Sequence, residues 1–99
     1  MTKKQVISYI ENLDDLPTFW REGSSGVVMI FDIAVDIRLI WWSARTSRDN
    51  KDILSIHDPT KELVCIATTG GSWKPPQHLW DLIEVHKLIH RLGGGVCTA

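Results

Sequence analysis

Residues 27–43 constrain the fold of this 99-residue chain more strongly than any other segment. Their sequence, VVMIFDIAVDIRLIWWS, is apolar at every odd position up to Trp41. The charged residues of the segment fall on even positions: Asp32, Asp36 and Arg38. Such alternation is typical of a β-strand with one buried side and one solvent-facing side. The apolar residues also fit a helical stripe, but the abundance of valine and isoleucine favours a strand because β-branched side chains are restricted in helices.

The length of this segment adds a second constraint. A single strand over residues 27–43 would extend about 50 Å, which exceeds the size of a domain of this length. We therefore expect a sharp bend or a tight hairpin near residues 32–36, although no glycine or Asn-Gly pair marks a turn there. The sequence leaves open whether the segment forms one bent strand or two strands.

The other segments predict a helix at each end of the chain and a further hairpin between them. Thr2 and Gln5 match a capping box at the start of the amphipathic segment MTKKQVISYIENL. Pro59 suits the second position of a β-turn in DPTK, between the apolar segments DILSIHD and ELVCIATT. A second helix is expected from about Pro76 to Leu92, ended by three glycines. The predicted fold is a two-layer α+β domain, in which an antiparallel meander of three to four strands packs against an N-terminal and a C-terminal helix.

Size and composition are those of one globular domain over residues 1–99, with a glycine-rich tail at residues 92–99. The net charge of −1 does not favour a general nucleic-acid binder, which needs a basic face. No segment reaches the roughly 20 uninterrupted apolar residues of a membrane helix, and the N-terminus lacks the apolar core of a signal peptide. Cys65 and Cys97 do not make a disulfide framework, so we expect reduced thiols and a cytoplasmic location.

The predicted C-terminal helix carries three of the four histidines. A helical wheel centres an apolar arc on His78. The arc contains Leu82, Val85, Ile89 and Leu92, and Leu79 and Ile83 widen it. His86 lies within this arc and His90 at its edge. Two histidines four residues apart suit zinc only when further ligands join them, and no His-Glu-x-x-His motif is present. We therefore expect no metal or cofactor, a half-buried His86 hydrogen-bonded through one ring nitrogen, and a His90 that complements the helix dipole.

Other chemistry-bearing residues give weaker patterns. Cys65 is the one thiol that could meet His86, but a cysteine in an apolar strand is more often a small buried residue. Asp32 and Asp36 could face Arg38 across a bend, where a cross-strand ion pair is the commoner role. The alternative function is a small enzyme or a ligand- or metal-binding domain that uses His57, Cys65, His86 or the aspartates Asp32 and Asp36. A second alternative is nucleic-acid binding through Arg45, Arg48, Lys51 and Lys74.

Five tryptophans are the strongest remaining functional pattern. Trp41 and Trp42 are adjacent in a predicted strand, so their side chains point to opposite sides and one must leave the main core. Trp80 lies on the polar side of the C-terminal helix, and exposed tryptophans beside charged residues are typical of protein–protein contacts. The candidate partner-binding residues are Trp42, Trp73, Lys74, Trp80, Glu84 and Lys87.

The sequence therefore favours a small non-catalytic interaction module that binds a protein partner through exposed tryptophans. Accessory, adaptor or inhibitor proteins of phages and mobile elements have this size and lack of catalytic motifs. Self-association into a homodimer is a second mode of binding. The other interpretation is that Trp73 and Trp80 only cover the loop between them and each other.

Overall fold

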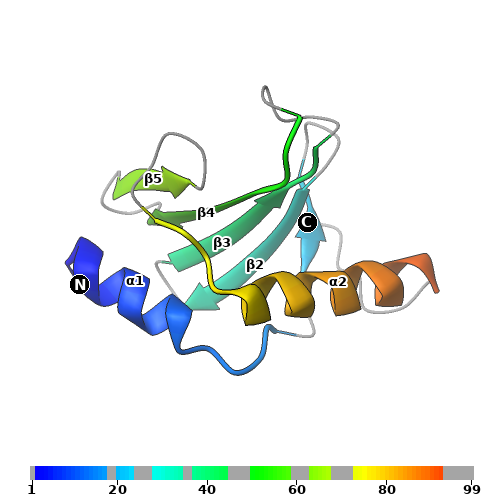
Figure 1. The fold of residues 1–99 in the computed structure, drawn as a ribbon, viewed down its shortest axis with the longest axis horizontal. Coiled ribbons are helices and arrows are strands. Elements are labelled where there is room, and N and C mark those ends of the chain that lie inside the picture. Colours follow the sequence, from blue (N-terminus) through cyan, green and yellow to red (C-terminus); the bar gives the residue numbers. More distant parts are fainter. Residues whose placement is uncertain are drawn as a thin grey trace.

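The computed structural model describes residues 2–17, 20–23, 28–34, 37–44, 50–58, 63–67 and 73–92. Its elements are, in order, α1 (Lys3–Glu11), β1 (Arg21–Glu22), β2 (Val28–Ala34), β3 (Ile37–Trp42), β4 (Ile53–Asp58), β5 (Leu63–Ala67) and α2 (Gln77–Arg91). The strands form one antiparallel sheet in which neighbours in space are neighbours in sequence, from β1 to β5 (Figure 1). The chain is a small α+β fold, and its sheet is the predicted meander.

Residues 27–43 form a hairpin rather than one bent strand. β2 and β3 pair in antiparallel orientation, with Asp32 opposite Arg38 and Ala34 opposite Ile37. The register shifts between Asp32 and Ala34, and an irregularity of this kind bends a strand just before its turn. Residues 35–36 between the two strands lie outside the described residues, and with them the candidate Asp36.

The sheet has one strand more than the sequence predicts. β1 consists of Arg21 and Glu22, which pair with Ile30 and Met29 of β2. Two residues carry no periodicity, so a strand of this length cannot be recognised from alternation. Trp20, the residue before β1, is buried, as expected for a side chain packed against the sheet.

β4 and β5 pair in antiparallel orientation at the place where the sequence predicts a second hairpin. Ser55 lies opposite Ala67, and Asp58 lies opposite Leu63. The turn between them, residues 59–62 with Pro59, is outside the described part of the chain, as are the side chains of β5. The position of the Cys65 thiol is therefore not described.

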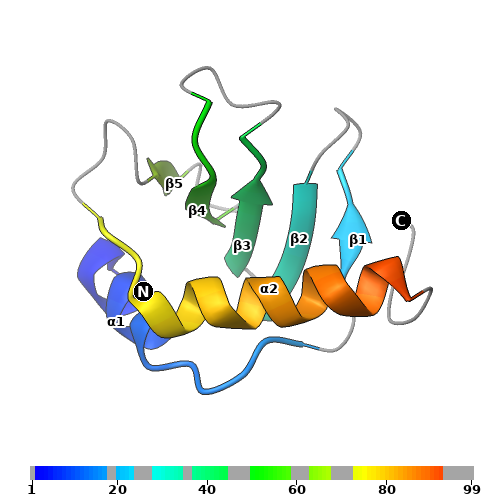
Figure 2. The ribbon, with the colours of Figure 1, turned by 45° about the vertical axis from the view of Figure 1, so that its right-hand side comes forward.

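Alternation along β3 decides which of its residues enter the core. Ile37, Leu39 and Trp41 are buried, whereas the residues between them are only partly buried. One buried cluster joins this side of the strands to both helices, and its members include Val6 and Ile10 of α1, Phe31 of β2, Leu39 and Trp41 of β3, Leu54 and Ile56 of β4, and Leu79 and Ile83 of α2. Figure 2 shows α2 running across the strands.

Both helices begin as the sequence predicts. The Thr2 side chain accepts a hydrogen bond from the Gln5 backbone N–H at 3.2 Å, and the Thr2 backbone N–H donates to Gln5 Oε1 at 2.8 Å. This reciprocal pair is a capping box. α2 follows Pro76, and His90 and Arg91 occupy its last turn, where cations complement the helix dipole. The glycines at residues 93–95 lie outside the described residues.

Neighbouring residues of β3 offer a test of this two-sided strand. Leu39→Ala removes a side chain with no solvent exposure, and we expect a loss of about 2–5 kcal/mol in the free energy of unfolding. Ile40→Ala removes a partly exposed side chain, and we expect a smaller loss, roughly 1–2 kcal/mol. Urea denaturation followed by circular dichroism measures both, and equal losses would contradict the assignment of sides.

Candidate functional site

The rotation of α2 about its axis determines which of its side chains reach the surface. Its buried residues are Leu79, Ile83 and His86. The predicted apolar arc included these three residues, but its predicted centre at His78 is wrong, because His78 is exposed and the buried side is turned toward Ile83. Three large apolar side chains are consequently exposed on α2: Val85 at 54%, Leu88 at 54% and Leu92 at 79%.

Aromatic rings from the sheet side of the molecule explain this rotation. Phe31 meets the ring of His86 edge-on at 5.1 Å between centroids, and Trp20 meets His90 in the same way at 5.2 Å. Lys87 Nζ lies 4.9 Å from the centroid of the Trp41 ring, in a cation–π contact. These rings contact His86, Lys87 and His90, so they hold one face of α2 against the strands and turn Val85 and Leu88 outward.

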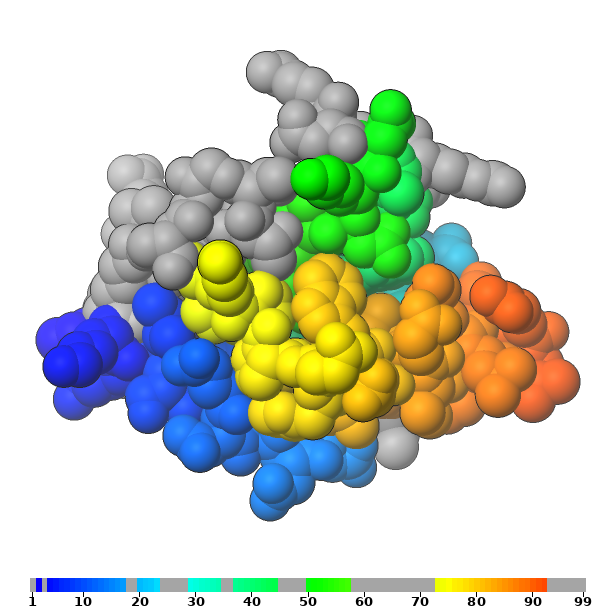
Figure 3. All heavy atoms as spheres, in the orientation of Figure 1, coloured from blue at the N-terminus to red at the C-terminus, as the bar shows by residue number. Residues whose placement is uncertain are grey.

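Charged residues border the exposed apolar side chains, which we call the α2 stripe (Val85, Leu88 and Leu92). Glu84 and Arg91 are both exposed. They line a shallow hollow together with Val85 and Leu88. Figure 3 shows α2 along the surface of the molecule, with its outer side open in this view. An apolar surface rimmed by charges is typical of protein contact sites.

The tryptophans do not form the single exposed patch that the sequence suggested. Trp73 is buried at 3% exposure, so the expectation that it is exposed is wrong. Trp80 is partly buried and packs against the core cluster. Trp42 donates its indole N–H to Ser55 Oγ at 3.0 Å, on the side of β3 opposite to Trp41 and α2. Alternation along β3 therefore separates Trp42 from Trp80.

The predicted charged residues remain at the surface. Lys87 Nζ donates to Glu84 Oε1 at 2.9 Å, and 64% of the Glu84 side chain stays exposed. Lys74 is exposed at the start of the segment that leads into α2. Glu84 and Lys87 thus lie on the same side of α2 as Trp80, as the sequence predicts.

His86 is more buried than predicted, with 4% exposure. Its Nδ1 has no hydrogen-bond partner among the described residues, so this ring nitrogen does not make the hydrogen bond that was expected through one of the two. Burial lowers the pKa of His86 because the charged imidazolium loses hydration, and the carboxylate of Asp15 opposes this effect only in part. His90 Nε2 lies 3.1 Å from Glu22 Oε1. Within the described residues, no three His, Cys, Asp or Glu side chains are placed to hold a metal ion.

Asp32 lies between two arginines on the sheet. Arg21 donates to both of its carboxylate oxygens, and Arg38 Nε donates to Oδ1 at 3.1 Å. The hydrogen bond from Arg21 is the main reason why the pKa of Asp32 is lowered. The predicted cross-strand ion pair between Asp32 and Arg38 is confirmed. Asp32 is therefore paired and ionised, unlike a carboxyl group held ready to donate a proton.

Sequence reasoning missed a contact between Ser55 and His57 on β4. Ser55 Oγ lies 3.2 Å from His57 Nε2 and also accepts from Trp42. Residues two apart on a strand share one side, which is the pattern that could have suggested the pair. Burial and the charge of Arg38 lower the pKa of His57. Ser55 has no solvent exposure, so a substrate cannot reach its hydroxyl in this conformation.

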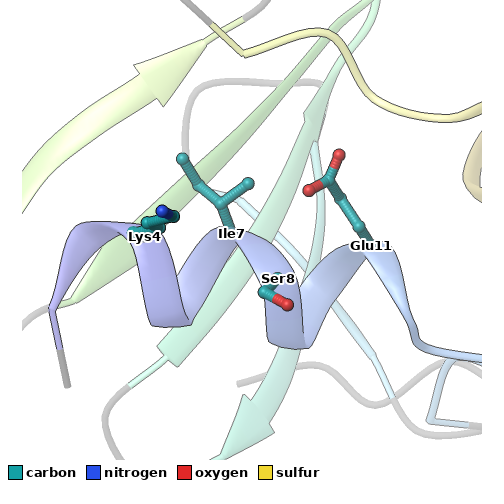
Figure 4. A pocket seen from close by; sticks show the side chains of 4 residues that line it. All are labelled: Lys4, Ile7, Ser8 and Glu11. Atoms are coloured by element: carbon teal, nitrogen blue, oxygen red, sulfur yellow. The ribbon is translucent and has the colours of Figure 1, made fainter.

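A second hollow lies on the outer side of α1. Lys4, Ile7, Ser8 and Glu11 line it, and Figure 4 shows their side chains on successive turns of the helix. Ile7 is partly buried against the core, and the remaining lining residues are polar or charged. Ile7 is the one apolar residue among the described residues that line this hollow, whereas the α2 stripe contains three exposed apolar side chains.

Two of the remaining sequence candidates lie within the described residues. Lys51 and Lys74 are exposed, whereas Arg45, Arg48 and Cys97 lie outside the described residues. In the part of the chain that the structure describes, no helix is both long and apolar enough to cross a membrane. No family model, no curated protein and no solved structure matches the chain.

The buried imidazole predicts how stability depends on pH. Because the pKa of His86 in the folded state is below the ordinary value of 6.5, the unfolded chain binds more protons under mildly acidic conditions. Stability should therefore be full above about pH 6.5, the ordinary pKa of histidine, and fall as the pH decreases below it. His57 contributes with the same sign.

Urea unfolding at a series of pH values measures this slope. His86→Leu should make the slope shallower, since it removes the titrating group at nearly constant volume and leaves no Nδ1 unpaired. His57→Gln serves as the comparison that isolates the second histidine. An unchanged slope in His86→Leu would show that His86 does not titrate below its ordinary range.

Proposed function

We propose that the chain is a small non-catalytic protein-interaction module, of accessory, adaptor or inhibitor type, that binds a protein partner through the outer side of α2. The observation that carries the proposal is the α2 stripe, in which three large apolar side chains are more than half exposed on one helix. Isolated exposed apolar residues are common, but three on one helix side form a continuous surface. Burial of such side chains in a contact is favourable by about 25 cal/mol for each Å² removed from water.

The arrangement of the helices supports this location. The proposal takes both helices to cover one side of the sheet in two layers, as the sequence predicts. In favour of this, buried residues of α1 and α2 belong to the same cluster as Phe31 and Leu39. In this arrangement the outer side of α2 is the surface of a layer, where a partner has access along the helix.

Charged residues around the stripe would give the contact its selectivity. Glu84 and Arg91 are exposed beside the apolar side chains. Charges at the rim of an interface direct association and exclude wrong partners more than they add affinity. Trp80 packs partly against the core in this proposal, so it supports the rim of the surface and is not a protruding anchor.

Leu88→Glu tests the proposal. The substitution places a charge in the middle of the stripe without touching the buried side of α2, so the fold should persist and binding of a protein partner should be lost. Tyr9→Glu is the matched control, since Tyr9 is a large side chain exposed at 40% on α1. A cross-linking pull-down from native lysate compares wild type, Leu88→Glu and Tyr9→Glu, with circular dichroism to verify folding.

The expected result is a protein that wild type and Tyr9→Glu retain and that Leu88→Glu releases. Direct binding measured with the purified partner must then show the same order of affinities. If Leu88→Glu binds that partner as tightly as wild type does, the α2 surface is not the binding site.

A further inference from the structure

We infer that the α2 stripe is occupied by a second copy of this chain, whose α2 packs antiparallel to the first. The inference rests on the proposed function, because it names the partner of the same surface. Two features of the described residues carry it: the spacing of the apolar side chains and the placement of the charges beside them.

The spacing is that of a helix–helix seam. Val85, Leu88 and Leu92 are separated by three and four residues, which keeps them on one side of a helix and matches the core positions of a heptad. The stripe extends over about 10 Å, at 1.5 Å per residue. In an antiparallel pair related by a two-fold axis, Val85 of each copy would meet Leu88 of the other, and Leu92 would lie level with Asp81 of the other copy.

The charges select the antiparallel orientation. Glu84 and Arg91 are seven residues apart and therefore lie on the same flank of the stripe, two turns from each other. An antiparallel two-fold pair brings Glu84 of each copy beside Arg91 of the other, which gives two symmetric ion pairs. A parallel pair would place Glu84 and Arg91 beside the opposite flank of the other copy, where Leu82 and Ile89 offer no charge to pair with.

Glu84 and Arg91 are both able to form these additional ion pairs. Glu84 uses Oε1 to accept from Lys87, and most of its side chain remains exposed. Arg91 forms no ion pair with another described residue and is exposed in the last turn of α2. Asp81 precedes Val85 by one turn, and the antiparallel pair brings this carboxylate level with Arg91 of the second copy as well.

The size of the surface sets the expected strength. A contact made mainly by one pair of short helices buries less than the roughly 1,200 Å² of a stable interface. The dimer should therefore be in exchange with monomer and depend on concentration. Such a weak contact is sensitive to single charges, which makes charge reversal an informative test.

The test is sedimentation velocity over a wide range of concentrations, at low and at high salt. Wild type should show a monomer–dimer equilibrium. Glu84→Arg alone and Arg91→Glu alone should each weaken the dimer by about tenfold or more, because each creates two like-charge contacts. Glu11→Arg reverses an exposed charge on α1 and should leave the equilibrium unchanged.

A mixture of the two single variants provides the decisive arm. In the mixed dimer, the two arginines on the flank of one copy face the two glutamates on the flank of the other, so association should return to near the wild-type level. No recovery in the mixture overturns the antiparallel arrangement. A wild type that stays monomeric at every concentration overturns the second copy as the occupant.

The two proposals fail separately. A monomeric wild type whose protein partner is still released by Leu88→Glu would leave the interaction surface in place and remove only the identity of the partner. A dimer that Leu88→Glu does not weaken would place self-association on another surface, which contradicts this inference. Partner binding that is also insensitive to Leu88→Glu contradicts the proposed function.

Discussion

The contact between the aromatic side chains of the sheet and one face of α2 determines which side of this helix faces outward. Strand alternation sends Phe31 and Trp41 toward the core, and these rings contact His86 and Lys87. Trp20 adds a third ring, which contacts His90 one turn later. A helix held at three points along one face has no freedom to rotate. The direction of the α2 stripe is therefore a consequence of the β2–β3 hairpin.

This orientation has an energetic cost at both sides of α2. It buries the imidazole of His86, whose Nδ1 lacks a partner among the described residues, and an unsatisfied buried polar atom costs about 1–3 kcal/mol. It also leaves Leu88 and Leu92 in water. Edge-on aromatic contacts and the cation–π contact of Lys87 offset part of this cost. A fold that keeps apolar side chains outside while burying a histidine is easiest to explain if the outer side of the helix is itself used in a contact.

Local sequence patterns predicted the two helices and the strands other than β1. Long-range contacts determine which side chains these elements expose. The alternation in residues 27–43 identified a strand region that had to turn, and Thr2 with Gln5 identified the start of α1. The rotation of α2 could not be predicted, since apolar residues nearly surround that helix and either arc could be buried. Trp20, Phe31 and Trp41, distant in sequence, choose between the arcs. Trp73 was misjudged for a related reason: it precedes a helix, and no periodicity shows whether a single side chain folds inward.

The other side of the sheet shows why α2 is the better candidate surface. There, the polar groups are largely satisfied by one another: Asp32 is held by Arg21 and Arg38, and Ser55 is held between Trp42 and His57. A ligand at that side would have to break these contacts before making its own, and each broken contact subtracts from its affinity. The outer side of α2 presents the reverse situation, because its three large apolar side chains are more than half exposed and Arg91 lacks an ion pair within the described residues. Binding there would remove apolar surface from water and add ion pairs without the loss of an existing interaction, and this difference is why we propose the helix as the binding surface.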